Sequence, residues 1–478
     1  MTIRHLALAV AACLLLAVAS LAVAHEPVYD AWAWLVWGRE LAGLQLDTSS
    51  GPSWKPLPVI LTAALSPAGD GAPALWLVLT RTSWLLGIVL AGALAHRLTR
   101  GLDGWLRAAA AGVAALTSML LLDDVTMWAR QGAAGMSEPV LVVLVLGAVL
   151  AALERRPGIA LGLAFLAALV RPEAWPLLGV YGLWLWRAEP ALRLRVAVVA
   201  LAVPALWFVP DLLASGGATT GAERARRGSG PATAEVLDVL MRAWMMPLAA
   251  TWPLALVAFW RTMRAPAAEP ARTVVAVLAA GALAWIAIVA VMAACGFAGL
   301  PRFMAPAAAI VGVLGGTGLA HLLALGRERR AIVGSACAVL LVATAAQFPR
   351  RAGDLPHAMS TTARIAGSHD RLRELVREVG RRPLLGCGRL ATSDVLVRTA
   401  LAWELDVPLS RVVGFGLPAM WSGAFVAGPG TRLDARRRLA RRARLLGSRG
   451  EWRIYLLDCS AIASASSSRS AGVSGARR

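Results

Sequence analysis

The sequence has almost no lysine, few charged residues of any kind, and none of the common nucleotide-binding or metalloprotease motifs. Lys55 is the single lysine, and charged residues make up 16% of the chain. A Walker A sequence, a Rossmann glycine pattern and an HExxH motif are all missing. These absences exclude a P-loop ATPase, a Rossmann dinucleotide enzyme and a zincin protease. Energy for group transfer or transport must then come from an activated lipid donor or an ion gradient.

Apolar residues dominate the chain instead. They make up 58% of it, more than a soluble protein of 478 residues could bury in one or two cores. They fall in blocks of about 18 to 22 residues, enough to cross roughly 30 Å of hydrocarbon. The blocks are residues 6–24, 74–95, 105–122, 138–153, 158–171, 174–187, 194–213, 244–260, 273–294, 303–324 and 331–348. We therefore predict an α-helical polytopic membrane protein with about eleven transmembrane helices in residues 1–348.

The formal charge of +20 comes from arginine, much of which lies between the apolar blocks and not in a nucleic-acid-binding module. Alternate loops are short and basic, and by the positive-inside rule they are cytoplasmic. These loops hold Arg97, Arg100, Arg107, Arg155, Arg156, Arg187, Arg193, Arg195, Arg261, Arg264, Arg272, Arg327, Arg329 and Arg330. We expect a multi-pass protein of the bacterial cytoplasmic (inner) membrane, with membrane lipids and no nucleic acid as partners. Its N-terminus is then cytoplasmic and its C-terminal domain extracytoplasmic.

The tail, residues 349–463, is predicted to be a small α/β domain. Its expected helices are residues 364–379, 393–405 and 436–446, and its expected strands are residues 383–387, 411–415 and 452–459. Cys387 and Cys459 each end a predicted strand, so parallel neighbouring strands would bring both thiols to one sheet edge. An oxidising compartment then favours a disulfide, and two buried free thiols are the alternative. Residues 464–478 are rich in Ser, Gly and Arg and are expected to be disordered.

The first external loop, residues 25–73, is the most unusual stretch of the sequence. It opens with His25-Glu26-Pro27-Val28-Tyr29-Asp30 and later contains Ser53-Trp54-Lys55-Pro56. Asp30, Trp34 and Trp37 share one face of a helix, which predicts an amphipathic helix at the membrane surface. The preceding span ends in a sequence typical of signal-peptidase sites, but its length favours an uncleaved anchor.

A long first external loop with an acidic residue just after the first span resembles the GT-C superfamily of membrane glycosyltransferases. The short paired spans in mid-chain and the outer C-terminal domain add to this resemblance, which covers residues 1–348 and is strongest to actinobacterial-type members. It implies transfer of a sugar from a polyprenyl-phosphate donor to a cell-envelope glycan or lipid acceptor at the outer membrane face. The Asp-Glu pair of the mannosyl-transferring relatives is replaced here by His25-Glu26 and Asp30.

The resemblance implies a catalytic carboxylate close to the first span. A positioned Asp or Glu can take the proton from an acceptor hydroxyl as the new bond forms. Asp30 is the first candidate for this base, and Glu26 and Asp47 are the alternates. The other interpretation of Asp30 is a solvated or helix-capping carboxylate.

Arginine and lysine near the outer ends of spans are the candidates for binding the donor phosphate. Arg302 and Arg171 are placed there by the predicted topology, and Lys55, the single lysine, lies in the first external loop. A guanidinium group can donate to two phosphate oxygens at once, and ionisable groups at such depth usually face protein, water or a ligand. Arg171 has a second interpretation, a structural ion pair with Glu173.

Sugar or acceptor binding is predicted for a further set of residues, and metal binding for one acidic pair. The first set is Trp34, Trp37, Trp54, Arg130, Glu138 and Glu173. The tryptophans can stack on sugar rings or form an aromatic belt at the membrane interface. Asp123 and Asp124 can hold a divalent metal, Mg²⁺ or Mn²⁺, or can simply end a span, and no other cofactor is expected.

Two other functions stay open at this stage. A lipid or polyol transporter or flippase would show repeated halves and charges near the bilayer midplane. The sequence shows no clear repeat, and its unusual charges gather at one face. A non-catalytic envelope assembly factor would use the tail domain as a docking surface.

Overall fold

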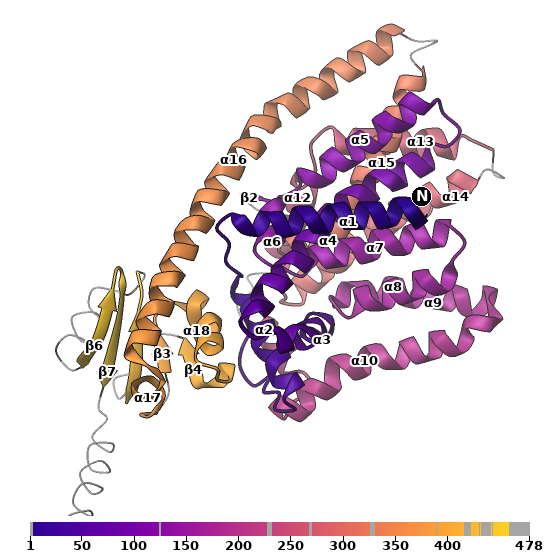
Figure 1. Ribbon diagram of the computed structural model, residues 1–478. Helices are drawn as coiled ribbons and strands as arrows, with labels where there is room; N and C mark the ends of the chain where they lie inside the picture. Colours follow the sequence, from indigo (N-terminus) through magenta and orange to yellow (C-terminus); the bar gives the residue numbers. More distant parts are fainter. Residues whose placement is uncertain are drawn as a thin grey trace, which may run out of the picture. The chain divides into compact units, whose positions relative to one another are not determined.

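The computed structural model describes residues 3–123, 126–226, 232–266, 270–325, 330–388, 390–414, 422–429, 431, 441 and 443–457. The chain divides into two compact units, which are described separately (Figure 1). Unit 1 comprises Met1–Val23, Ser53–Ile60 and Asp70–Ser360. Unit 2 comprises Ala24–Pro52, Leu61–Gly69 and Thr361–Arg478. The first external loop thus belongs largely with the C-terminal domain and not with the spans, and unit 2 resumes at Thr361 rather than at residue 349.

Unit 1 is a helical bundle. Its helices are α1 (Ile3–Ala19), the start of α3 (Pro56–Leu65), α4 (Ala72–Leu98), α5 (Gly104–Met119), α6 (Trp128–Ala133), α7 (Glu138–Leu153), α8 (Pro157–Ala168), α9 (Trp175–Ala188), α10 (Arg193–Ser215), α11 (Thr220–Ala225), α12 (Ala232–Met245), α13 (Thr251–Met263), α14 (Pro270–Ala294), α15 (Ala305–Ala324) and the first part of α16 (Arg330–Val379). Strands β1 (Leu122–Asp123) and β2 (Thr126–Met127) form a short antiparallel ribbon. Within the bundle α1 packs against α4, α4 against α7, and α7 against α8.

The bundle contains the apolar segments that the sequence predicts. In the described part of the chain, five helical segments are long and apolar enough to span a membrane: Arg4–Ala22, Pro56–Leu98, Pro190–Ser215, Ala271–Ala294 and Pro301–Ala324. Three shorter apolar helices are Glu138–Leu153, Pro157–Ala168 and Val333–Pro349. The polytopic helical fold is confirmed, whereas the count of eleven spans remains a prediction.

Helix α15 is the most buried element of unit 1, and its small residues explain why. A side chain at Gly316 would collide with the backbone of α5 at Ala110, and one at Gly318 with the backbone of α13 at Leu254. Glycine at these two positions lets three helices approach closely. This close packing fixes the position of α15 in the bundle, and with it the position of Arg302, which lies just before the helix begins.

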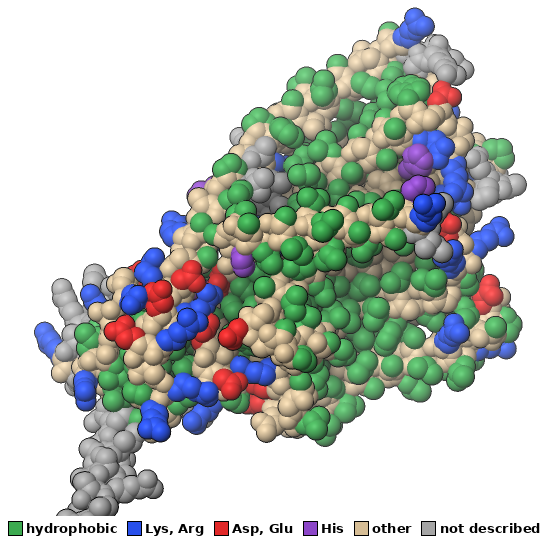
Figure 2. All heavy atoms as spheres, viewed as in Figure 1, with side chains coloured by type: hydrophobic (Ala, Val, Ile, Leu, Met, Phe, Trp, Pro, Cys, Tyr) green, Lys and Arg blue, Asp and Glu red, His purple; other side chains and the backbone are tan. Residues whose placement is uncertain are grey.

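The two ends of α7 differ in character. At its C-terminal end, Glu154 lies 3.9 Å from Arg97 of α4, and Arg107 of α5 lies 2.6 Å from His96. Figure 2 shows basic side chains gathered at this end of unit 1 and an apolar flank along the helices. Glu138 begins the helix at the other end, about 24 Å away for 16 residues of α-helix. Two loops predicted to be cytoplasmic therefore meet at one end, and Glu138 lies at the opposite end.

Unit 2 combines helices with one five-stranded sheet. The helices are α2 (Tyr29–Ala42), the end of α3, the last part of α16, α17 (Arg381–Leu385) and α18 (Arg398–Glu404). The strands are β3 (Leu390–Thr392), β4 (Val412–Gly414), β5 (Gly423–Ala427), β6 (Arg444–Arg449) and β7 (Trp452–Leu457), in the spatial order β4-β3-β5-β7-β6. β3 pairs in parallel with β4 and β5, and the β5–β7 and β7–β6 pairs are antiparallel.

Several tail predictions can be compared with this sheet. The strands at residues 411–415 and 452–459 are present as β4 and β7, and residues 364–379 lie in α16. The prediction of a strand at residues 383–387 is wrong. The chain turns at Gly380, with φ 80°, and then forms a helix, α17. Most of the predicted basic helix at 436–446 lies outside the described residues, as do 464–478. Its last three residues, 444–446, belong to strand β6, so the helix prediction is wrong there. Cys387 is disulfide-bonded, and Cys459, its predicted partner, also lies outside the described residues.

The amphipathic helix predicted in the first external loop requires correction. Residues Ala31 to Gly38 of α2 are buried on every face, and Glu40 is buried as well. Thr62 donates a 2.6 Å hydrogen bond to the carbonyl of Trp34, and any side chain at Gly38 would collide with Thr62. α2 is therefore a core helix of unit 2, because tertiary packing covers the face that the sequence pattern left to solvent.

Candidate active site

A short segment of the first external loop, residues 53–57, carries Lys55 into unit 1. Proline at position 56 starts α3 with a residue that has no backbone N–H to satisfy. On one side the indole of Trp54 donates to the carbonyl of Leu206 at 3.1 Å. On the other side the N–H of Leu57 donates to the carbonyl of Leu169 at 3.1 Å. Both flanks of Lys55 are thereby fixed to helices of the bundle.

Lys55 meets two arginines at one carboxylate oxygen, Oε1 of Glu138. Arg171 Nη1 lies 2.9 Å from this oxygen, Lys55 Nζ 3.5 Å and Arg302 Nε 3.9 Å. Lys55 also donates to Ser137 Oγ at 3.0 Å. The three predicted phosphate-binding cations, far apart in the sequence, therefore lie together in unit 1. We call Lys55, Glu138, Arg171, Glu173 and Arg302 the cation cluster.

The cation cluster is buried. Glu138 is 0% exposed, Glu173 1%, Arg171 6% and Lys55 8%, and Arg302 is partly exposed. Arg171 donates through Nε and Nη2 to both oxygens of Glu173, so the structural pairing predicted for these two residues is present. The five side chains carry three positive charges and two negative ones. A buried excess of positive charge favours an anionic ligand, and α7 adds the positive end of its dipole.

Phe303 supports the two arginines, a role that the sequence did not reveal. The guanidinium carbon of Arg171 lies 3.4 Å from the centroid of the Phe303 ring, and that of Arg302 lies 5.3 Å from it. An aromatic face stabilises such cations without neutralising their charge. The pattern Pro301-Arg302-Phe303 at the start of an apolar span is the one sequence signal that could have indicated it.

Asp211 is a second residue that the sequence analysis missed. It is 2% exposed on α10, a helix with few other buried residues, and its Oδ2 accepts a 2.8 Å hydrogen bond from the N–H of Gly221. A Cβ at Gly221 would lie 3.1 Å from the backbone nitrogen of Trp54. Asp211 thus fixes a turn that packs directly against the segment carrying Lys55.

The candidate catalytic bases all belong to unit 2. Asp30 is partly buried in the first turn of α2. Glu26 accepts hydrogen bonds from Trp32 at 3.0 Å and Arg373 at 2.6 Å, and its Oε1 lies 2.7 Å from Nδ1 of His369. Asp47 accepts from Ser410 Oγ at 2.6 Å and from its neighbour Ser49. Glu26 and Asp47 therefore take part in interactions within unit 2, and the catalytic role of all three carboxylates stays a prediction.

Glu40 of α2 is a buried acid that the sequence analysis did not single out. Burial raises the pKa of its carboxyl to about 7, although the N–H of Asp47 donates to Oε2 at 3.0 Å. Its other oxygen has no hydrogen-bond partner among the described residues. Such a group gains and loses its proton near neutral pH.

The predicted sugar-binding residues lie in different surroundings. Trp34 and Trp37 are fully buried in unit 2, and Trp54 is buried in unit 1. Glu138 and Glu173 belong to the cation cluster, and Arg130 lies partly buried on α6. Their proposed contacts with sugar or acceptor stay predictions.

The metal prediction cannot be compared side chain by side chain, because Asp124 lies outside the described residues and only the backbone of Asp123 is described, in β1. Among the side chains that are described, no group of three or more His, Cys, Asp or Glu residues could hold a metal ion.

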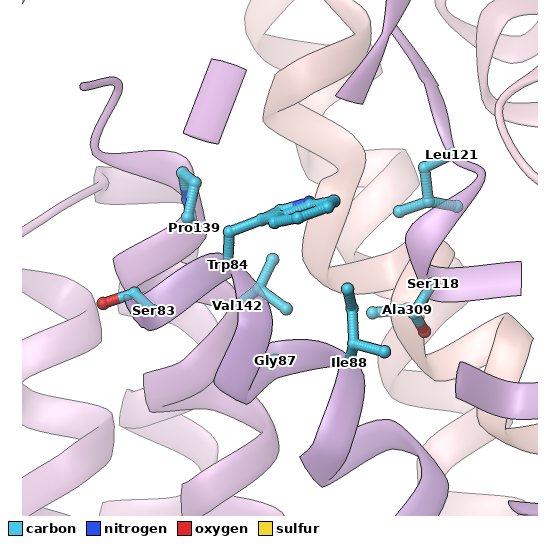
Figure 3. Close-up of a pocket in the computed structure, with 9 residues that line it drawn as sticks. All are labelled: Ser83, Trp84, Gly87, Ile88, Ser118, Leu121, Pro139, Val142 and Ala309. Atoms are coloured by element: carbon cyan, nitrogen blue, oxygen red, sulfur yellow. The ribbon is translucent and has the colours of Figure 1, made fainter. Parts of the chain in front are cut away.

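A small apolar cavity is lined in part by Pro139, the residue that follows Glu138 in the sequence. Residues of α4, α5 and α15 also line it, including Trp84 and Ser118 (Figure 3). Its volume of about 10 Å³ holds no more than a water molecule. The cavity is too small for a sugar or a prenyl group.

No protein-family profile and no curated protein sequence matches the chain, but solved structures do. ArnT from Cupriavidus metallidurans in the apo state is 17% identical, with a TM-score of 0.52, over 94% of this chain and 97% of ArnT. ArnT from the same organism bound to undecaprenyl phosphate is also 17% identical, with a TM-score of 0.54, over 96% of this chain and 99% of ArnT. The similarity extends over nearly the whole of both chains. The protein therefore has the fold of ArnT, and the predicted GT-C-like fold is confirmed.

Proposed function

We propose that this chain is a membrane glycosyltransferase that moves a sugar from a polyprenyl-phosphate donor to a cell-envelope glycan or lipid acceptor. The observation that carries the proposal is the convergence of Lys55, Arg171 and Arg302 on one buried carboxylate oxygen. The ArnT fold supports it, since one of the two ArnT structures holds undecaprenyl phosphate. The charge distribution along α7 supports a reaction at the outer face of the cytoplasmic membrane.

The cations of the cluster have a defined task in this reaction. In the donor, a phosphodiester links the lipid to the anomeric carbon of the sugar. When the bond between that carbon and the phosphate oxygen breaks, the electron pair stays on the phosphate. Positive groups fixed in a dry site stabilise this developing charge without having to reorganise. Arg171 and Arg302 are suited to it because a guanidinium group binds two phosphate oxygens.

The acceptor hydroxyl needs a base as it attacks the anomeric carbon. In the proposal its proton passes to the carboxylate of Asp30, so that the new glycosidic bond forms as the bond to phosphate breaks. The products are the glycosylated acceptor and polyprenyl phosphate. Any Mg²⁺ or Mn²⁺ would act in addition to these residues.

The test is sugar transfer by the purified full-length protein in lipid nanodiscs, supplied with a panel of polyprenyl-phosphate sugars. We expect transfer or donor hydrolysis with one of them, and a loss of about 10²- to 10⁴-fold in Asp30→Asn with unchanged donor binding. Asp70→Asn, which changes an exposed carboxylate of the same loop, is the matched control and retains activity. Transport of substrate into liposomes without any chemistry would favour the flippase alternative, and full cellular activity of Asp30→Asn would contradict the assignment of the base.

A further inference from the structure

One feature of the cation cluster is unusual for a site that binds a phosphate: it already contains an anion at its centre. Oxygen Oε1 of Glu138 is the common neighbour of Lys55, Arg171 and Arg302. Oxygen Oε2 is buried and has no hydrogen-bond donor among the described residues. The negative charge of Glu138 is therefore directed at the same three cations that a phosphate would contact.

The proposed reaction changes the charge of the lipid phosphate. The donor is a phosphodiester with a single negative charge. Cleavage leaves the electron pair on the phosphate oxygen, and the product is a monoester whose second ionisation has a pKa near 6, as in a phosphorylated side chain. At pH 8 the product therefore carries almost one negative charge more than the donor, and cations alone would hold it more tightly than the donor.

We propose that Glu138 is a specificity residue that biases this site toward the singly charged donor and against the doubly charged product. Its carboxylate repels a phosphate in proportion to the charge on that phosphate, so the product is disfavoured more than the donor. The enzyme thereby releases polyprenyl phosphate and avoids inhibition by it. This inference rests on the proposed function, because it assumes that the cluster binds the lipid phosphate.

The charged groups that face Glu138 among the described residues are the three cations of the cluster, with Glu173 on the far side of Arg171. Arg171, Arg302 and Lys55 are bases with high pKa values as free side chains, and Glu173 is held by Arg171. The elements that pack around the start of α7 also carry Arg81 on α4 and Arg130 on α6, both guanidinium groups. A change in relative binding between pH 5.5 and 8 therefore reports the ionisation of the ligand.

The experiment compares two lipids that differ in this one charge: undecaprenyl phosphate and its methyl phosphodiester, which cannot transfer a sugar. Binding to the full-length protein in nanodiscs is measured at pH 5.5 and at pH 8. In the wild type, where the five side chains keep a single excess positive charge, we expect the monoester to gain no more than about twofold over the diester at pH 8. In the Glu138→Gln protein the affinity for the monoester should rise about tenfold relative to that for the diester at pH 8, and much less at pH 5.5.

The matched control is Glu154→Gln, which removes the same charge from the same residue type at the other end of α7. It should bind both lipids as the wild type does. A wild type that binds the monoester ten times more tightly at pH 8, or a Glu138→Gln protein that improves both lipids equally, would overturn the inference. The wild-type comparison decides even if the variant fails to fold. Binding of neither lipid would instead refute the proposed function itself.

Discussion

Arg171 and Glu138 stand 33 positions apart in the sequence, yet their charged atoms lie 2.9 Å apart in the interior of unit 1. Glu173 holds the opposite side of the same guanidinium group at 2.7 Å. Two carboxylates thus fix one arginine at the point where the first external loop, the end of α8 and the start of α15 meet.

Removing Glu138 should destabilise the protein strongly. Glu138→Ala removes a buried carboxylate that three cations share, which costs about 3 to 5 kcal/mol of the free energy of unfolding. Glu154→Ala, at the partly exposed end of the same helix, should cost about 1 kcal/mol or less. Denaturant titration of both variants in mixed micelles measures the difference, and equal losses would show that the cluster does not stabilise the fold.

Arg302 should matter for activity more than for stability. It is partly exposed and lies 3.9 Å from Glu138, so Arg302→Ala leaves the Arg171 pairs intact. We expect sugar transfer to fall by about 10²- to 10³-fold, because one group that stabilises the leaving phosphate is lost. Arg97→Ala removes a cation at the opposite end of the bundle and should leave transfer unchanged. Comparable rates for the two variants would contradict the site.

Glu40 should make the stability of unit 2 depend on pH. Because burial raises its folded-state pKa from 4.5 to about 7, the folded protein binds this proton more tightly than the unfolded chain does. The stabilisation is complete below pH 4.5 and is lost as the pH rises to 7 and beyond, by up to about 3 kcal/mol. Glu40→Gln should lack this decline. Unfolding profiles of both proteins from pH 4 to 8 check it, and parallel profiles would refute it.

Glu26 should hold the first external loop within unit 2. Glu26→Ala deprives Trp32, His369 and Arg373 of their shared acceptor. We expect a loss of about 3 kcal/mol and faster hydrogen exchange in peptides covering residues 24–42. Asp370→Ala is the control, because that carboxylate also bonds Arg373 but is 63% exposed. Unchanged exchange in the Glu26 variant would show that other contacts suffice.

The sequence predicted the class of fold and singled out the three cations that the structure brings together, because both leave a local signal. Long apolar blocks require membrane spans, and an arginine at the mouth of such a block, such as Arg302, needs a partner or a ligand. The convergence of Lys55, Glu138 and Arg302 could not be predicted, since it depends on how helices pack over long sequence separations. Helix α2 shows the same limit, because its amphipathic pattern gave no indication that neighbouring elements cover its polar face.

The central claim is that the cation cluster binds the phosphate of a polyprenyl lipid. The most direct measurement is the affinity of the protein in nanodiscs for undecaprenyl phosphate relative to undecaprenol, which lacks the phosphate, for the wild type and for Lys55→Met. The account predicts a clear preference of the wild type for the phosphate and a loss of most of that preference in the variant. Equal affinity for the two lipids, or a preference that Lys55→Met retains in full, would contradict it.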